Sequence, residues 1–225
     1  MKKWSICAVT MGSTMDELIH QVLLAQKEAD LVEMRIDFLI DQKNINLKPL
    51  SKLINKDVII TCRRRDEGGR WGGTETNRLR ILCQAFELGF AFVDVELRTL
   101  EEGLFTIPKK MKTKVIVSFH DFTKTPPIAK MKKIMERMQI FNPDIKKIAT
   151  MVNSEINNIT LFQIMLDKKM KEEICIVGMG KLGKKTRIIA PLLGGSFIYC
   201  SINGKSSAPG QISCKEIKEI YRLIS

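Results

Sequence analysis

Eight short runs of β-branched and other apolar residues alternate along this chain with stretches of helical periodicity, and this alternation limits the fold more than any other feature. The apolar runs are residues 4–10, 31–36, 57–63, 91–96, 113–119, 144–149, 173–178 and 196–201. Helical patterns follow at 14–28, 46–55, 74–88, 99–110, 125–139, 154–168, 182–193 and 213–224. Strands that alternate with helices indicate βαβ units and a parallel sheet. Eight such units in 225 residues predict a single-domain (β/α)₈ TIM barrel over residues 1–225.

A doubly wound open sheet is the alternative arrangement of the same units. Folds of that kind usually bind a nucleotide at a Gly-rich turn that follows a strand. The stretch 67–73 lacks the G-x-G-x-x-G spacing, whereas 178–183 has it but is not followed by an acidic residue about 20 positions on. We therefore favour the barrel and expect no nucleotide cofactor.

The charge and the apolar runs bear on possible partners. A net charge of +12 is compatible with nucleic-acid binding, but the lysines are spread over predicted helix surfaces and aromatic residues make up only 6% of the chain. A stacking platform for bases is therefore not evident. We expect a basic surface that attracts small anions, and no nucleic-acid partner. No apolar run approaches the roughly 20 residues that span a bilayer, so we also expect no membrane partner and a cytoplasmic location.

The six cysteines are widely scattered. They stand at positions 7, 62, 83, 175, 200 and 214, without a C-x-x-C pair and without a histidine nearby. Zinc sites and disulfide frameworks both depend on closer or patterned spacing. Reduced cysteine packs as a small hydrophobe inside strands. The sequence therefore predicts six structural cysteines, no disulfide framework and no metal site.

Charged residues alternate with apolar ones inside the predicted strands. Successive strand residues point to opposite faces, so Val32 and Met34 share one face while Glu33 and Arg35 share the other. In a closed barrel the wholly apolar faces pack on the helices, and the other faces point inwards. The inward charged set is Glu33, Arg35, Arg63, Asp94, Glu96, His120 and Lys147. Buried charges are costly unless they pair with one another or with a ligand, so this set predicts a site.

His120 ends the apolar run 115–119 and is followed by Asp121. The carboxyl end of a strand is where α/β enzymes place their chemistry, and a neutral imidazole can take up and return a proton near pH 7. A hydrogen-bonded structural histidine is the other interpretation. The second histidine, His20, belongs to a surface-helix pattern.

A lysine beside a histidine narrows the chemistry. Strand alternation puts Lys147 inside the barrel among cationic groups such as Arg35 and Arg63, and we expect this desolvated, cationic setting to lower its pKa. A neutral lysine forms a Schiff base with a ketone, a histidine can then move the proton on the neighbouring carbon, and arginines hold a carboxylate. Lys146 faces the helices and can extend its ammonium group to solvent. The sequence thus predicts a Schiff-base lyase or aldolase acting on a small keto acid.

Four segments make the prediction more specific. In chain order they are EMRID (33–37), SFHDF (118–122), KIA (147–149) and SAPGQ (207–211), and together they resemble the signature segments of type I 3-dehydroquinate dehydratase. The resemblance spans nearly the whole chain, although KIA alone is a weak motif. It implies a (β/α)₈ barrel of the shikimate pathway, a homodimer without cofactor or metal, and the dehydration of 3-dehydroquinate to 3-dehydroshikimate.

The resemblance also implies roles for individual residues. Lys147 matches the imine-forming lysine, His120 the general acid and base, and Glu67 the glutamate that orients the histidine. Arg187 matches the arginine that clamps the C1 carboxylate. The remaining matches to substrate-binding positions are Glu33, Arg35, Arg63, Ser207 and Gln211.

Two features depart from the expected pattern, and one competing enzyme class stays open. Thr186 stands where the family more often has serine, and the region that includes Arg64, Arg65 and Arg70 is unusually basic. A class I aldolase of similar architecture is the alternative, with a phosphate site at the last two strand–helix loops. Arg187 and the SAPGQ segment instead suit a carboxylate and hydroxyls.

Overall fold

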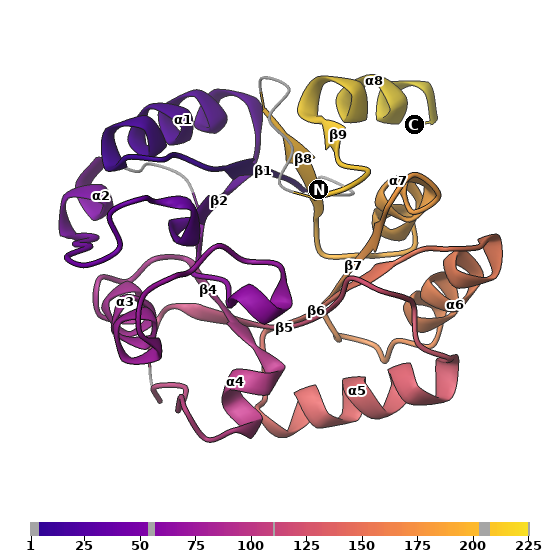
Figure 1. Cartoon of the computed structure of the whole chain (residues 1–225). Helices are drawn as coiled ribbons and strands as arrows, with labels where there is room; N and C mark the ends of the chain where they lie inside the picture. The colour runs from indigo at the N-terminus through magenta and orange to yellow at the C-terminus, as the bar shows by residue number, and fades with distance from the viewer. Residues whose placement is uncertain (1–4, 54–56, 110, 203–207, 225) are drawn as a thin grey trace.

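Eight parallel strands and the helices between them form a curled sheet with the helices outside, as a computed structural model of the chain shows (Figure 1). The structure describes residues 5–53, 57–109, 111–202 and 208–224. The strands are β1 (Ile6–Thr10), β2 (Leu31–Arg35), β3 (Asp57–Thr61), β4 (Phe92–Glu96), β5 (Lys114–Asp121), β6 (Ile145–Met151), β7 (Ile174–Met179) and β8 (Ile198–Ser201). This single domain confirms the predicted (β/α)₈ fold class.

The helices follow the strands in the predicted order. They are α1 (Met15–Glu28), α2 (Lys48–Leu53), α3 (Glu75–Glu87), α4 (Leu97–Glu101), α5 (Ile128–Ile140), α6 (Glu155–Leu166), α7 (Lys184–Leu192) and α8 (Cys214–Ile224), with two 3₁₀ turns, η1 (Ile36–Phe38) and η2 (Arg65–Glu67). Thr14 and Thr74 cap the first turns of α1 and α3 with their side chains. Within the described residues no helix is long and apolar enough to cross a membrane.

The fourth helix is much shorter than its pattern predicts. We expected a helix over 99–110, but α4 ends at Glu101. Gly103 follows with a left-handed backbone (φ 68°), which is the usual way for a helix to stop. The apolar periodicity beyond it comes from Phe105 and Ile107, which pack on the core from a non-helical segment.

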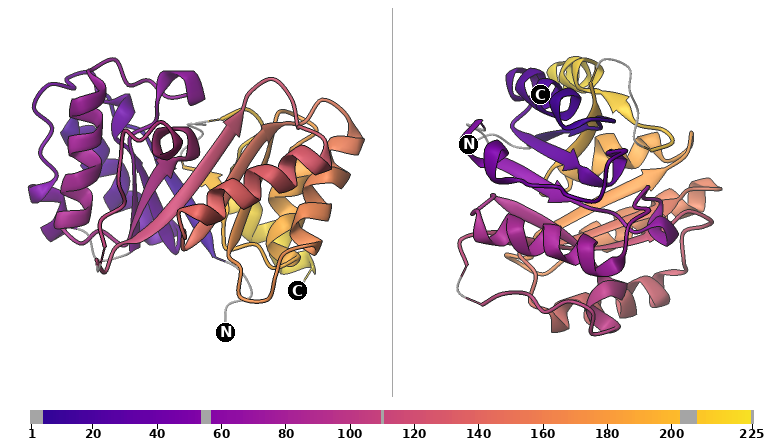
Figure 2. Two further views of the ribbon diagram at one scale, coloured as in Figure 1. Left: turned by 90° about the horizontal axis from the view of Figure 1, so that it is seen from below. Right: turned by 60° about the vertical axis from the view of Figure 1, so that its left-hand side comes forward.

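Strand alternation divides the core into two layers. The face that includes Val32 and Met34 packs against the surrounding helices, and the opposite face forms a second apolar cluster inside the curled sheet, which includes Cys7, Ile116 and Tyr199. Figure 2 shows the helices lying outside the sheet. The predicted assignment of strand faces is therefore confirmed, and the inward charged side chains share the interior with the second cluster.

The ring of strands has a seam between β7 and β8. Hydrogen-bonded pairing runs in the order β7-β6-β5-β4-β3-β2-β1-β8-β9, where β9 (Ile212–Ser213) is a short strand that the sequence pattern did not predict. No ladder joins β7 to β8 in the described part of the chain. Instead, Ser196 N donates to Ile174 O at 2.9 Å just before β8 begins. The segment after β8 turns back towards the end of β7, where Gly180 N donates to Pro209 O at 3.1 Å.

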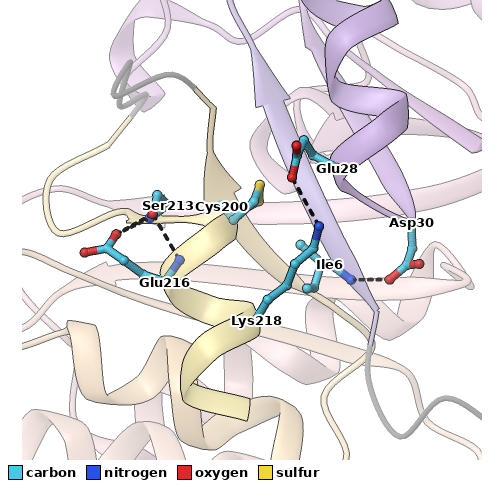
Figure 3. Close-up of a disulfide and its surroundings, with 8 residues drawn as sticks. Ile6, Glu28, Asp30, Cys200, Ser213, Glu216 and Lys218 are labelled. Atoms are coloured by element: carbon cyan, nitrogen blue, oxygen red, sulfur yellow. Dashed lines mark hydrogen bonds and ion pairs between the residues drawn. A yellow bond between two sulfur atoms is a disulfide. The ribbon is translucent and has the colours of Figure 1, made fainter. Parts of the chain in front are cut away.

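A disulfide between Cys200 and Cys214 corrects the prediction that the cysteines form no such bond. Cys200 lies on β8 (Figure 3). Cys214 begins α8, and the pairing of β8 with β9 brings the two Cα atoms to 5.0 Å. Parallel pairing across a return loop leaves no signature in cysteine spacing, so the sequence could not reveal it. Of the four free cysteines, Cys83 is exposed and the other three are buried.

Reduction of this disulfide should destabilise the fold. The bond closes a loop with a sequence separation of 14 residues, and closing a loop of this size typically contributes roughly 2–4 kcal/mol. We expect a lower thermal unfolding midpoint in the presence of a phosphine reductant. A Cys200→Ser/Cys214→Ser variant should unfold at one temperature with or without reductant. Equal midpoints for the oxidised and reduced wild-type protein would contradict the expectation.

Candidate active site

One cavity at the carboxyl ends of the strands gathers most of the side chains that the sequence singled out. Its polar lining consists of Glu33, Arg35, Arg63, His120, Lys147, Arg187, Tyr199 and Gln211. Six of these side chains lie on strands or just after a strand ends, because alternate residues of a strand point inwards. Arg187 comes from α7 and Gln211 from the segment after β8. Ser207, also predicted to bind substrate, lies outside the described residues.

Lys147 lies between two carboxylates. Its Nζ is 3.0 Å from Asp94 Oδ2 and 3.3 Å from Glu33 Oε1, and the residue is 6% exposed. Burial alone would lower the pKa of Lys147, but Asp94 and Glu33 outweigh it and raise that pKa above its ordinary value. The prediction that neighbouring arginines lower the pKa was therefore wrong for the unliganded site, because Asp94 and Glu33 are the lysine's direct partners.

Lys146 occupies the opposite face of β6, as strand alternation predicted. It does not reach freely into solvent, however. Its ammonium group forms an ion pair with Glu172, and the residue is only 5% exposed. The two adjacent lysines are therefore both buried and both paired, but only Lys147 lines the cavity.

His120 is joined to Glu67, which lies behind it on the turn η2. His120 Nδ1 and Glu67 Oε2 are 2.9 Å apart. Burial, with the positive charges of Arg63 and Lys147, lowers the pKa of His120 well below its ordinary value, so the imidazole is neutral at pH 7. Burial also raises the pKa of Glu67 to about 8, in spite of Arg63. Near neutral pH a protonated Glu67 therefore lies beside a neutral imidazole, and Glu67 loses its proton as the pH rises through about 8.

Buried charges of alternating sign form a row that runs from Arg78 to Lys147. Arg63 Nη2 is 2.7 Å from Asp94 Oδ2, and Arg63 Nη1 is 3.3 Å from Glu96 Oε1. Glu96 in turn accepts from Arg78 Nη1 at 2.9 Å, and Arg78 is fully buried on α3. Ser118 Oγ donates to Asp94 Oδ1 at 2.6 Å. Burial opposes the ionised form of Asp94, but Arg63 and Lys147 hold its pKa well below the usual range.

The arginines of the cavity differ in how fully they are paired. Arg35 donates twice to Asp37, at 2.9 Å and 2.8 Å, and so holds an internal partner. Arg187 makes one long contact to Pro209 O at 3.4 Å, and its buried Nε has no partner within the described structure. Burial lowers the pKa of Arg187 to about 10, so the group stays cationic at neutral pH. Arg187 is therefore the guanidinium best able to accept an anionic ligand.

The unusually basic stretch after β3 is mostly accounted for by local pairs. Arg64 forms ion pairs with Asp66 at 3.0 Å and with Glu102 at 2.7 Å. The guanidinium carbon of Arg70 lies 4.4 Å from the centroid of the Phe38 ring, a cation–π contact. These contacts stabilise the rim of the barrel and do not line the cavity.

Two features of the cavity were missed in the sequence. Strand alternation places Asp94 inside the barrel without indicating a role for it, although it is the nearest partner of Lys147. Tyr199 also lines the cavity, but the sequence does not point to it, because the run 196–201 has no charged residue to mark its inner face. Alternation groups Phe197 with Tyr199 on one face of that run, and the structure shows that this face points inwards.

Comparison with known proteins adds independent findings. The family model described as type I 3-dehydroquinase matches residues 6–225. Relatives named 3-dehydroquinate dehydratase include one from Coxiella burnetii, 39% identical over 218 residues (96% of this chain and 92% of the relative). Another, from Methanocaldococcus jannaschii, is 36% identical over 222 residues, which are 97% of this chain and 98% of the relative.

Solved structures agree with the sequence comparisons. The 3-dehydroquinate dehydratase of Geobacillus kaustophilus superposes with a TM-score of 0.88 at 24% identity, covering 99% of this chain and 91% of the other. The type I 3-dehydroquinate dehydratase of Clostridium difficile, solved with covalently modified comenic acid, gives 0.87 at 26% identity, with 98% and 92% covered. The fold, the extent of the family match and the identities lead to one conclusion: this chain belongs to the type I 3-dehydroquinase family.

Proposed function

We propose that this chain is a hydro-lyase that converts 3-dehydroquinate to 3-dehydroshikimate through a Schiff base on Lys147. The observation that carries the proposal is the position of the Lys147 ammonium group. It lies in the cavity within 3.0 Å of Asp94 and 3.3 Å of Glu33, with His120 lining the same space. The covalently modified comenic acid in the Clostridium difficile relative supports a covalent route.

The first step joins Lys147 to the substrate ketone. The ammonium group must first lose a proton, and the carboxylate of Glu33 or Asp94 is near enough to receive it when the substrate displaces solvent. The neutral amine then adds to the C3 carbonyl carbon, and the protonated carboxylate returns its proton to the carbinolamine hydroxyl, which leaves as water and gives a protonated iminium. The same carboxylates that hold the ammonium in the free enzyme stabilise this cation in the intermediate.

The second step belongs to His120. Its neutral imidazole removes a proton from C2, and the electrons of that C–H bond flow into the iminium to give an enamine. The enamine then expels the C1 hydroxyl, which takes the proton from the imidazolium and leaves as water. Hydrolysis of the conjugated iminium frees the product and restores Lys147. The balance is one water lost from the substrate.

The remaining polar groups bind the substrate in this proposal. Arg187 receives the C1 carboxylate, because its guanidinium retains hydrogen-bonding capacity. Glu33, Arg35 and Arg63 contact the substrate through the hydrogen-bond donors and acceptors that their ion pairs within the protein do not use. Gln211, with Ser207 from outside the described residues, covers the substrate from the segment after β8. A homodimer acting in the shikimate pathway is proposed on the family resemblance alone.

Formation of a conjugated enone provides the direct test. Purified protein mixed with 3-dehydroquinate should produce the ultraviolet absorbance of 3-dehydroshikimate, and the product should be identified by mass as substrate minus one water. A protein that folds correctly and gives no enone would overturn the proposal. A product of carbon–carbon cleavage would favour the aldolase alternative.

Arg187→Ala should weaken substrate binding strongly. Removal of one partner from a buried charge pair typically costs roughly 2–5 kcal/mol, and we expect this loss mainly as a higher KM. Gln211→Ala should raise KM less, because it removes a neutral hydrogen bond. Arg137→Ala is a matched control, since this arginine pairs with Glu101 on the outer surface. An unchanged KM for Arg187→Ala would show that the carboxylate binds elsewhere.

Glu67→Gln should alter the pH dependence of turnover more than its maximum. While Glu67 is protonated it donates to His120 Nδ1, which leaves the imidazole proton on Nε2 and blocks that nitrogen as a base. Above a pKa of about 8 the carboxylate accepts from Nδ1 and frees Nε2. Wild-type kcat/KM should therefore rise with pH through about 8, and the glutamine variant should lack this limb. Profiles measured from about pH 6 to about pH 10 check this, and identical profiles would argue against the pairing.

A further inference from the structure

Tyr199 has a buried hydroxyl without a partner at the edge of the reaction site. Five buried side-chain polar atoms lack a hydrogen bond within the described residues, and two of them, the Tyr199 hydroxyl and Arg187 Nε, belong to residues that line the cavity. Buried polar groups are nearly always satisfied, because an unsatisfied one is destabilising. An unpaired group beside a cavity therefore indicates a ligand that supplies the missing partner.

The aromatic ring of Tyr199 lies close to the proposed nucleophile, Lys147. Lys147 Nζ lies 4.3 Å from the centroid of this ring, a cation–π contact. The ring also packs against Phe197, edge to face at 5.1 Å, and both residues face inwards from the β8 region because strand side chains alternate. Because Lys147 Nζ lies over this ring, a substrate bonded to Lys147 would lie against Tyr199.

The hydroxyl remains a donor over the working pH range. Burial, with the negative charge of Glu33, raises the pKa of Tyr199 well above its ordinary value. A neutral phenol has one hydrogen to donate and suits a hydroxyl oxygen of a ligand. In 3-dehydroquinate the carbon that would join Lys147 has two ring neighbours. C2 carries only hydrogen, and C4 carries a hydroxyl group.

We propose that Tyr199 is a substrate-binding and specificity-determining residue whose hydroxyl donates a hydrogen bond to the C4 hydroxyl oxygen of the substrate. This inference rests on the proposed function, because it takes the substrate and its attachment point from there. Its consequence is that a keto acid without an oxygen at that position leaves the Tyr199 hydroxyl buried and unpaired. Sites that hydrogen-bond a substrate hydroxyl reject analogues that lack it for this reason.

Tyr199→Phe is the decisive variant, because it removes one oxygen and keeps the ring beside Lys147. We expect kcat/KM for 3-dehydroquinate to fall about three- to tenfold, as for the loss of one neutral hydrogen bond. The thermal midpoint should not fall, since the lost hydroxyl has no partner in the free protein. Tyr221→Phe is the matched control. The Tyr221 hydroxyl donates to Ile188 O at 2.9 Å, away from the cavity lining, so its loss should affect stability and leave kcat/KM unchanged.

A substrate analogue completes the test. The wild-type enzyme should discriminate against 4-deoxy-3-dehydroquinate, and Tyr199→Phe should lose part of that discrimination, because its site no longer holds an unpaired hydroxyl. Wild-type kcat/KM in Tyr199→Phe, or the same discrimination in both proteins, would overturn the inference. Borohydride trapping of the wild-type enzyme during turnover separates this result from the parent proposal. Absence of a trapped adduct would contradict the Schiff-base mechanism. Trapping together with an unchanged kcat/KM in Tyr199→Phe would contradict only the role of Tyr199.

Discussion

Replacement of Lys147 by alanine should abolish turnover, with a loss on the order of 10⁴-fold or more, as when a covalent nucleophile is removed from other enzymes. Without the amine there is no iminium to draw electrons from the C2–H bond, and that proton stays on carbon. The variant should still bind substrate, since Arg187 and the other polar groups remain. The measurement is single-turnover and steady-state formation of the enone.

Trapping distinguishes the two adjacent lysines. Borohydride added during wild-type turnover should reduce the iminium to a stable secondary amine, and mass spectrometry of a digest should place the added mass on Lys147. Lys146→Met is the matched control, because Lys146 is equally buried but faces the helices and pairs with Glu172. It should keep turnover and trapping and lose some stability. An adduct on Lys146 would contradict the strand register, the mechanism and the choice of nucleophile together.

His120→Ala should lower kcat by roughly 10²–10⁴-fold, the usual contribution of a positioned acid and base, while Lys147 still forms the imine. The reason is that His120 acts after the carbon framework has been attached. The variant should therefore accumulate a borohydride-reducible adduct that carries the substrate skeleton and not that of the product.

The second histidine supplies the control for this experiment. His20 is exposed on α1, on the outside of the barrel, and His20→Ala should behave as the wild type. A His120→Ala variant with near wild-type kcat would exclude His120 from the mechanism. A variant that no longer traps would show that His120 is needed earlier than we propose.

The strand pattern predicted which side chains meet in the cavity because an alternation of two leaves little freedom. Once Val32 and Met34 are assigned to the helix side, Glu33 must point inwards, and the same holds for Lys147 beside Lys146. The positions of such side chains follow from periodicity alone. The assignment needed no knowledge of which strand lies beside which.

The ionisation of the site could not be predicted in the same way. The pKa of Lys147 depends on whether a carboxylate or a guanidinium is nearer, and that difference of a few ångströms comes from rotamers and not from sequence order. The Cys200–Cys214 bond and the early end of α4 were missed for a related reason. Each depends on where the chain goes after an element ends, which local periodicity does not record.

The row of alternating charges from Arg78 on α3 to Lys147 on β6 determines which positions can change during evolution or redesign. Each charged side chain in the row pairs with two neighbours of opposite charge. A single replacement therefore leaves an uncompensated buried charge, at a cost of roughly 3–5 kcal/mol. Substitutions along the row should therefore be strongly non-additive, and Arg78 and Glu96 can be exchanged for apolar residues only together. The apolar lining residues Val9, Val177 and Met179 stand outside the row. Reshaping of the cavity for another carbonyl compound should begin with these three.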